Sequence, residues 1–146
     1  MLSSSENLHI IESLGLIIVS HNNVLDQQSV ERVITDLKSN PFFRKEYSIL
    51  IDIRKANTEL NFEEIEDLSH FVFENIDDTG LKKFAILTSE SLLNKAVQYV
   101  RSYKHSSKYQ VFSALEPALH WLKVPQDRKS QVEIKLKHLN TLKTNT

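Results

Sequence analysis

The sequence predicts a layered α/β domain, with an N-terminal hairpin, a mixed but mostly parallel sheet of about five strands, and about four helices. Short runs rich in β-branched residues alternate with longer segments whose apolar residues recur at helical spacing. The run 48–53 is almost continuous in isoleucine and leucine, which is typical of a central strand covered on both faces. The 146 residues are 40% hydrophobic and 25% charged, and this composition suits one globular domain.

The first expected elements are two strands, 8–12 and 16–20, joined as a hairpin. Gly15 lies between them and can adopt the positive φ of a tight turn. A helix is expected next, with Asp26 as its N-cap and Asn40-Pro41 as its stop. Its apolar face comprises Val30, Val33, Ile34 and Leu37.

The central strand 48–53 is followed by a polar loop and by a second helix. Asn61 and Glu64 have the spacing of a capping box, so we expect this helix to begin there and to end at 77–80. Its apolar residues are Phe62, Ile65, Leu68 and Val72. A further buried strand is expected at 83–88.

The remaining expected elements are a third helix, a last strand and a fourth helix. The third helix starts at about Ser89 or Ser91, because its apolar residues recur at helical intervals from there. The last strand is 109–112. We expect a second capping box at 113–116, which would place Pro117 in the first turn of the fourth helix.

Residues 126–146 form a basic C-terminal extension to an expected domain at 1–125. Val132, Ile134 and Leu136 alternate like a strand, whereas Val132, Leu136 and Leu139 also suit a helix. Disorder is the third alternative. The extension could be an appended element or an arm that binds a partner.

The bulk composition narrows the functional classes. Cysteine is absent, which excludes a disulfide framework and a cysteine nucleophile. The basic residues of the extension have no aromatic residues among them, so we expect no nucleic-acid binding. The chain has neither a secretory signal pattern nor an apolar run of transmembrane length, and we therefore expect a cytoplasmic protein without integral membrane association.

Three segments, together with the order of the elements, carry a resemblance to a known family. They are YSILIDIRKA after NPFF, LKKFAILTSESLL, and YQVFSALEPALHWL. Over roughly residues 8–123 the chain resembles the STAS domain of anti-sigma-factor antagonists, and most closely its stand-alone SpoIIAA-like subgroup. The resemblance implies a layered α/β fold and a regulatory, non-enzymatic protein that acts through protein contacts.

The resemblance also implies a regulatory site after the central strand. In the family, a serine in an Asp-Ser-Ser-Gly-like turn at a helix start is phosphorylated by a partner kinase. Asp52 matches the acidic residue late in the strand, but the turn is replaced by 60–64, which has neither a hydroxyl group nor glycine. The nearest hydroxyl group belongs to Thr58. The subgroup's fold likeness to lipid-binding CRAL-TRIO domains implies a small apolar pocket.

The candidate interaction or switch loop therefore lies at the carboxyl end of the central strand, where α/β proteins usually bind ligands. Asp52 and Arg54 point to the same side of an extended segment and could pair, or could satisfy loop backbone groups. The members of this loop are Asp52, Arg54, Lys55, Asn57, Thr58 and Asn61.

Aromatic residues supply a second candidate surface. They cluster at the connection between the first helix and the central strand and continue on the second helix. A surplus apolar face suggests a protein partner or self-association, although the C-terminal extension could instead cover it. The candidate interface aromatics are Phe42, Phe43, Tyr47 and Phe73.

Two functional hypotheses follow. The first is a non-enzymatic cytoplasmic regulatory module that binds a protein partner and forms a homodimer. The alternative is a protein that binds a small apolar ligand or lipid in a pocket between the sheet and the helices. We expect no cofactor, no metal site and no catalytic residues, since the six histidines lack metal-ligand spacing and no nucleophile lies next to a base.

Overall fold

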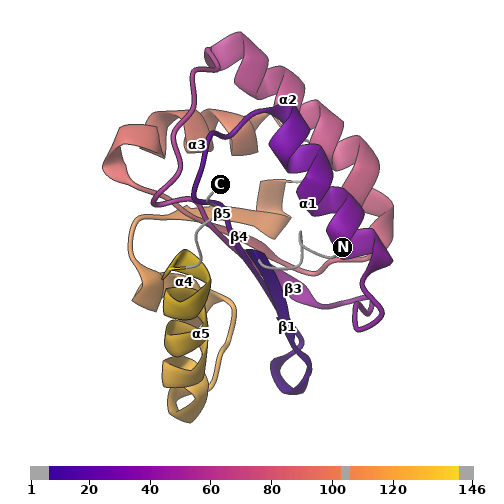
Figure 1. Ribbon diagram of the computed structural model, residues 1–146, viewed down its shortest axis with the longest axis vertical. Helices are drawn as coiled ribbons and strands as arrows, with labels where there is room; N and C mark the ends of the chain where they lie inside the picture. Colours follow the sequence, from indigo (N-terminus) through magenta and orange to yellow (C-terminus); the bar gives the residue numbers. More distant parts are fainter. Residues whose placement is uncertain (1–6, 103–105, 142–146) are drawn as a thin grey trace.

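The chain folds around one sheet that carries helices on both faces (Figure 1). A computed structural model describes residues 7–102 and 106–141. The strands are β1 (Leu8–Ile11), β2 (Leu16–Ser20), β3 (Ser48–Asp52), β4 (Phe84–Leu87) and β5 (Tyr109–Phe112). The α-helices are α1 (Gln27–Ser39), α2 (Phe62–Ile76), α3 (Leu93–Arg101), α4 (Leu115–Trp121) and α5 (Lys129–Thr141).

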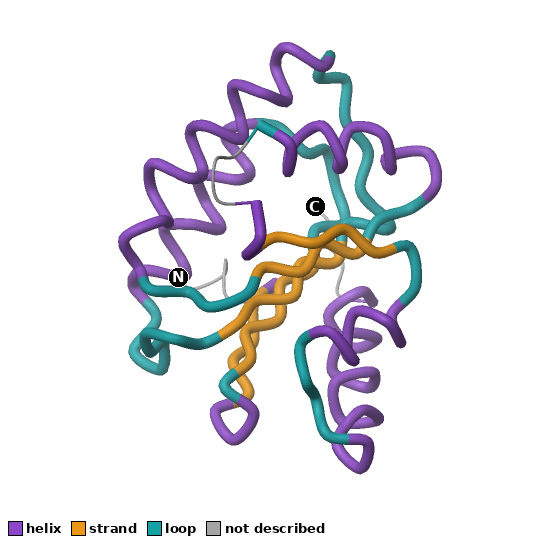
Figure 2. Tube along the Cα trace, turned by 180° about the vertical axis from the view of Figure 1, so that it is seen from behind, coloured by secondary structure: helices purple, strands orange, loops and turns teal. Residues whose placement is uncertain are grey.

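The strands lie in the sheet in the order in which they occur along the chain. β1 pairs with β2 in the antiparallel direction, and β2 to β5 are parallel. Parallel strands that are added in one direction by right-handed crossovers place all crossover helices on one face. α1, α2 and α3 accordingly share a face, while α4 and α5 cover the other (Figure 2). The predicted α/β class, with a mixed and mostly parallel sheet, is confirmed.

Alternation along the strands sorts the core into two halves. Ile17, Ile49 and Ile86 face the layer of α1 to α3. Leu16, Leu50 and Leu87 face α4 and α5. The nearly continuous aliphatic composition of the central strands therefore reflects two buried faces, as predicted from 48–53.

Both of the first two helices begin where their sequences indicate. Asp26 and Ser29 form a reciprocal capping arrangement at the start of α1. Asn61 and Glu64 form the expected capping box at the start of α2. These local bonds satisfy backbone N–H groups that have no partner within the helix, which explains why the boundaries were readable from sequence.

The predicted capping box at 113–116 is wrong. Ala114 is the N-cap of α4 and no side chain caps the helix. Starting at Leu115 turns Ala118 and Leu119 into the core, where they are 0% and 2% exposed. This register puts Pro117 at the third helical position, where proline has no N–H group for a cap to bind.

The C-terminal extension is helical within the described residues, and α5 makes a fifth α-helix where about four were expected. Val132, Leu136 and Leu139 are buried against the sheet face that contains Leu16 and Leu50. Arg128 also donates a hydrogen bond from Nη2 to Ser13 Oγ over 2.6 Å. α5 therefore forms part of the same core as the sheet.

The described helices are short relative to a lipid bilayer. None of those in residues 7–102 and 106–141 combines the length and the apolar character that crossing a membrane requires.

Candidate functional site

Two polar side chains end the central strands on the face toward α5. Ser20 and Asp52 are direct partners in the register of β2 and β3. They are 1% and 2% exposed. Buried polar groups of this kind require hydrogen-bond partners, because desolvation otherwise costs free energy.

Asp52 and Arg54 do form the ion pair that the sequence allowed. Arg54 Nε and Nη2 donate to Asp52 Oδ1 and Oδ2 at 3.0 and 2.8 Å. The backbone N–H of Arg54 also donates to Oδ1 at 3.0 Å, so Asp52 holds the loop as well. The two alternatives that the sequence left open, an ion pair and a bond to the loop backbone, are therefore both present.

The partner that the sequence did not indicate is Asn140 of α5. Its Nδ2 donates to Asp52 Oδ2 at 3.0 Å, and its Oδ1 accepts a hydrogen bond from Ser20 Oγ. Asn22 joins the same cluster, because its Oδ1 is 2.8 Å from Ser20 Oγ. No local signal marks Asn140, since this contact exists only when α5 lies on the sheet.

The hydrogen bonds to Asp52 give its carboxylate a structural role. Burial raises the pKa of its carboxyl, but the bonds from Arg54 and Asn140 outweigh this effect, and the pKa lies below its ordinary value. An ionised carboxylate offers about four acceptor positions. Arg54 and Asn140 fill four of them, so Asp52 has no spare position with which to take a proton from a substrate.

The loop after β3 is bound to the loop after β2 by three hydrogen bonds, which we call the cross-loop clamp. Leu25 N–H donates to Asn57 O at 2.7 Å, and Asn57 N–H donates to Asn23 O at 3.3 Å. Thr58 Oγ1 donates to Leu25 O at 2.6 Å. The Thr58 hydroxyl therefore joins the two loops, and it also accepts a hydrogen bond from Leu60 N–H at 3.2 Å. Lys55 is exposed.

The predicted interface aromatics divide into different environments. Phe42 is 53% exposed, and its backbone N–H is held by Asn40 Oδ1 at 2.8 Å. Phe43 and Tyr47 are half-buried against the core. Phe73 is 5% exposed, with its ring centroid 4.9 Å from that of Tyr109, so we correct the expectation that it faces a partner. α2 packs against α1 and α3 as well as on the sheet. It therefore buries apolar side chains, including Phe73, on more than one side of the helix.

A cavity of about 100 Å³ lies between the sheet and α1, α2 and α3. Its surface is almost wholly apolar. Residues from β2, β3 and β4 form its floor, and the three helices form its roof. The lining includes Val33, Ile34, Ile51, Leu68, Val72 and Ala96.

Four side chains with polar groups also line this cavity, namely His21, Thr58, Lys95 and Tyr99. His21 and Thr58 belong to the two loops that the cross-loop clamp joins. The clamp therefore lies at the end of the cavity that is next to the carboxyl ends of β2 and β3. The predicted switch loop thus contributes Thr58 to a cavity, although Asp52 and Arg54 lie on the opposite face of the sheet. The size of the cavity could not be foreseen, because no sequence pattern reports unfilled volume.

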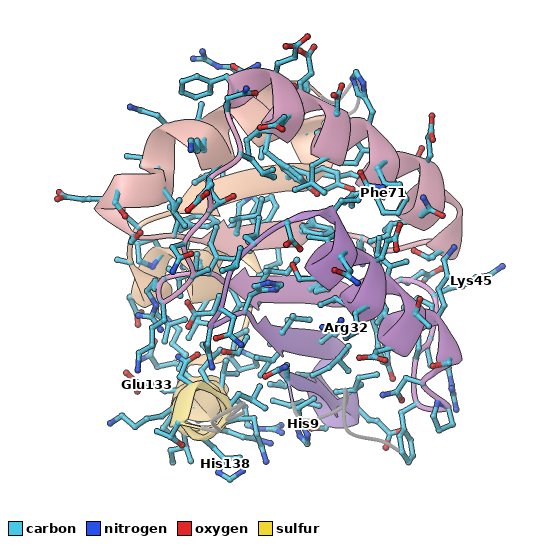
Figure 3. All side chains as sticks on the ribbon, turned by 45° about the horizontal axis from the view of Figure 1, so that its top comes forward. His9, Arg32, Lys45, Phe71, Glu133 and His138 are labelled. Carbon is cyan, nitrogen blue, oxygen red and sulfur yellow. The ribbon has the colours of Figure 1, made fainter. Side chains whose placement is uncertain are left out.

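Histidines do not assemble a metal centre in the described part of the chain, where no three His, Asp or Glu side chains are placed to hold an ion. His9 and His138 lie on the side that carries α5, and Arg32 lies on α1 (Figure 3). Burial lowers the pKa of His9, and the nearby charges of Lys135 and His138 lower it further. His9 of β1 therefore lies near Lys135 and His138 of α5, and the lowered pKa favours its neutral form.

Comparison with known proteins gives no relative. No protein-family model, no curated protein and no solved structure matches the chain.

Proposed function

We propose that the protein binds one small, predominantly apolar molecule in the cavity between the sheet and α1 to α3, as a carrier or sensor. The observation that supports this proposal is the apolar cavity of about 100 Å³. Protein interiors usually contain few voids larger than a water molecule. Concave apolar spaces with a few polar side chains are the usual form of small-molecule sites.

The free energy of an empty cavity supports the same proposal. A void of this size costs about 2 kcal/mol in stability, at roughly 24 cal/mol per Å³. A larger residue at Ala96, which lines the cavity, would reduce that cost. An apolar cavity stays dry, and one of comparable size in another protein takes up benzene or xenon. An apolar ligand would recover the lost contacts without displacing bound water.

Binding is favoured over catalysis by where the polar groups lie. Asp52, Arg54 and Asn140 satisfy one another on the opposite face of the sheet. Thr58 Oγ1 is bonded to Leu25 O, at the edge of the cavity. The cavity itself offers mainly carbon surface.

The proposal is tested with benzene and methyl NMR. Saturable shifts are expected for the methyl groups of Leu68, Val72 and Ala96, with a higher unfolding temperature as ligand is added. Ala96→Leu should abolish the shifts by filling the space. Native mass spectrometry of gently purified protein would show any ligand retained from the cell. Benzene-induced shifts that never saturate, or that persist in Ala96→Leu, would sink the proposal.

A second candidate function is protein contact through Phe42, including formation of a homodimer. Its support is an exposed ring on a loop that hydrogen bonds hold: Arg44 Nη1 donates to Pro41 O at 2.9 Å and to Phe43 O at 3.0 Å. An ordered aromatic residue loses little entropy when a partner covers it. Sedimentation of the wild type and of Phe42→Ser tests this, and a monomer at all concentrations would exclude the homodimer.

The STAS assignment also stands as a proposal. Its support is the order of elements, with a hairpin and a helix followed by three strand-helix units, and the position of Asp52 at the end of β3. An experimental structure superimposed on STAS domains tests it.

A further inference from the structure

α3 presents one face to the cavity. Leu92, just before the helix, and Lys95, Ala96 and Tyr99 within it all line the space. Their spacing of three and four residues places them along one side of a helix. Among the described residues that line the cavity, Tyr99 is the only tyrosine.

Tyr99 is held in place independently of its hydroxyl. Its ring centroid lies 5.7 Å from that of Phe73. Its backbone carbonyl accepts a hydrogen bond from Ser69 Oγ at 2.7 Å, and Ser69 is fully buried in α2. The position of the ring is thus determined by the packing of α2 against α3.

The Tyr99 hydroxyl has no hydrogen-bond partner among residues 7–102 and 106–141. Tyr99 is half-buried beside the core, and burial raises the pKa of its hydroxyl. Every fully buried side-chain nitrogen or oxygen of the described residues has a partner, so this hydroxyl keeps some accessible surface. Tyr99 lines the cavity, so a ligand held there lies within reach of this side chain.

The other polar side chains of the lining have different roles. Thr58 donates to Leu25 O, and His21 Nε2 lies 3.3 Å from Val24 O. Lys95 is half-buried, and a lysine in such a position can extend its ammonium group toward solvent. Tyr99 is therefore the polar group best placed to meet a ligand.

We propose that the ligand is a small neutral hydrocarbon with one oxygen acceptor, such as a ketone, and that Tyr99 Oη donates a hydrogen bond to it. This inference rests on the proposed function, since it names the chemical class that the same cavity takes. A neutral acceptor fits better than a carboxylate, because an anion in a carbon-lined space loses hydration that one hydroxyl does not replace.

Cyclopentanone and cyclopentane test the inference, because they are similar in size and differ in the carbonyl group. Binding to the wild type and to Tyr99→Phe is measured by NMR shifts of the Leu68 and Val72 methyl groups. Tyr99→Phe should weaken cyclopentanone binding about 3- to 10-fold, the usual worth of one hydrogen bond. Cyclopentane affinity should stay within about twofold. The infrared carbonyl stretch of bound cyclopentanone should lie lower in the wild type than in the variant.

Lys95→Met is the matched control, since it changes the other polar side chain that α3 contributes to the lining. Equal loss of both ligands in Tyr99→Phe would overturn the inference, because it would indicate altered shape. Loss of the ketone preference in Lys95→Met alone would also overturn it. If cyclopentane binds and the ketone is unaffected by either variant, the assignment to Tyr99 fails while the proposed function stands. If neither molecule binds the wild type, both fail.

Discussion

Asn140 Nδ2 donates to Asp52 Oδ2 at 3.0 Å, across 88 residues of sequence. The bond joins the last turn of α5 to the end of the central strand. Ser20 binds the same amide group, so one side chain satisfies two buried polar residues. The C-terminal helix is therefore attached by polar contacts as well as by Val132, Leu136 and Leu139.

Removing this amide should destabilise the fold. Asn140→Ala is expected to lower the free energy of unfolding by about 1–3 kcal/mol, because Ser20 and Asp52 each lose a partner in a buried place. Asn94→Ala is the control, since Asn94 is exposed on α3 and the gain in helix propensity is the same. Urea denaturation measures both. Equal effects of the two substitutions would show that the cluster contributes nothing.

The ion pair of Asp52 predicts a stability that depends on pH. The folded pKa lies below the ordinary value of 3.8, which the unfolded chain approaches. The contribution of Asp52 is therefore complete above the unfolded pKa and is lost as the pH falls through the folded pKa. We expect the free energy of unfolding to decrease between about pH 5 and pH 2, and to do so less steeply in Asp52→Asn. Parallel pH profiles for the two proteins would contradict this origin.

Two buried alanines on opposite faces of the sheet test the cavity through stability. Ala96 lines it, whereas Ala118 is 0% exposed and packs in the other half of the core. Ala96→Leu should leave stability unchanged or raise it by about 1 kcal/mol, because the added carbons enter empty space. Ala118→Leu should lower it by about 1–3 kcal/mol through overpacking. Similar losses at both sites in thermal and urea unfolding would mean that no usable space exists beside Ala96.

The cross-loop clamp predicts an effect of Thr58. Thr58→Val removes the hydroxyl that donates to Leu25 O and accepts from Leu60 N–H, and it should lower the free energy of unfolding by about 1 kcal/mol. Thr35→Val is the control, on the exposed side of α1. Amide hydrogen exchange at Leu25 should accelerate in Thr58→Val if the clamp opens. Unchanged exchange there would mean that the backbone bonds alone hold the two loops.

Features that depend on nearest neighbours along the chain could be predicted from sequence. The capping arrangements at Asp26 and Asn61, the positive φ of 59° at Gly15, and the two-faced burial of β3 follow from local bonds, local sterics and strand composition. The class of the fold followed from the alternation of such elements, because crossover handedness leaves few arrangements.

The start of α4, the position of α5 and the surroundings of Phe73 were decided by packing at long sequence separation. The same Val132 and Leu136 fit a strand or a helix until the face of β2 and β3 selects the helix. Asn140 and Tyr99 acquire their roles for the same reason: a polar group in the interior is defined by what the folded chain places next to it. Sequence determined which elements form, and only the tertiary structure decided which polar groups they bring together and which space they leave unfilled.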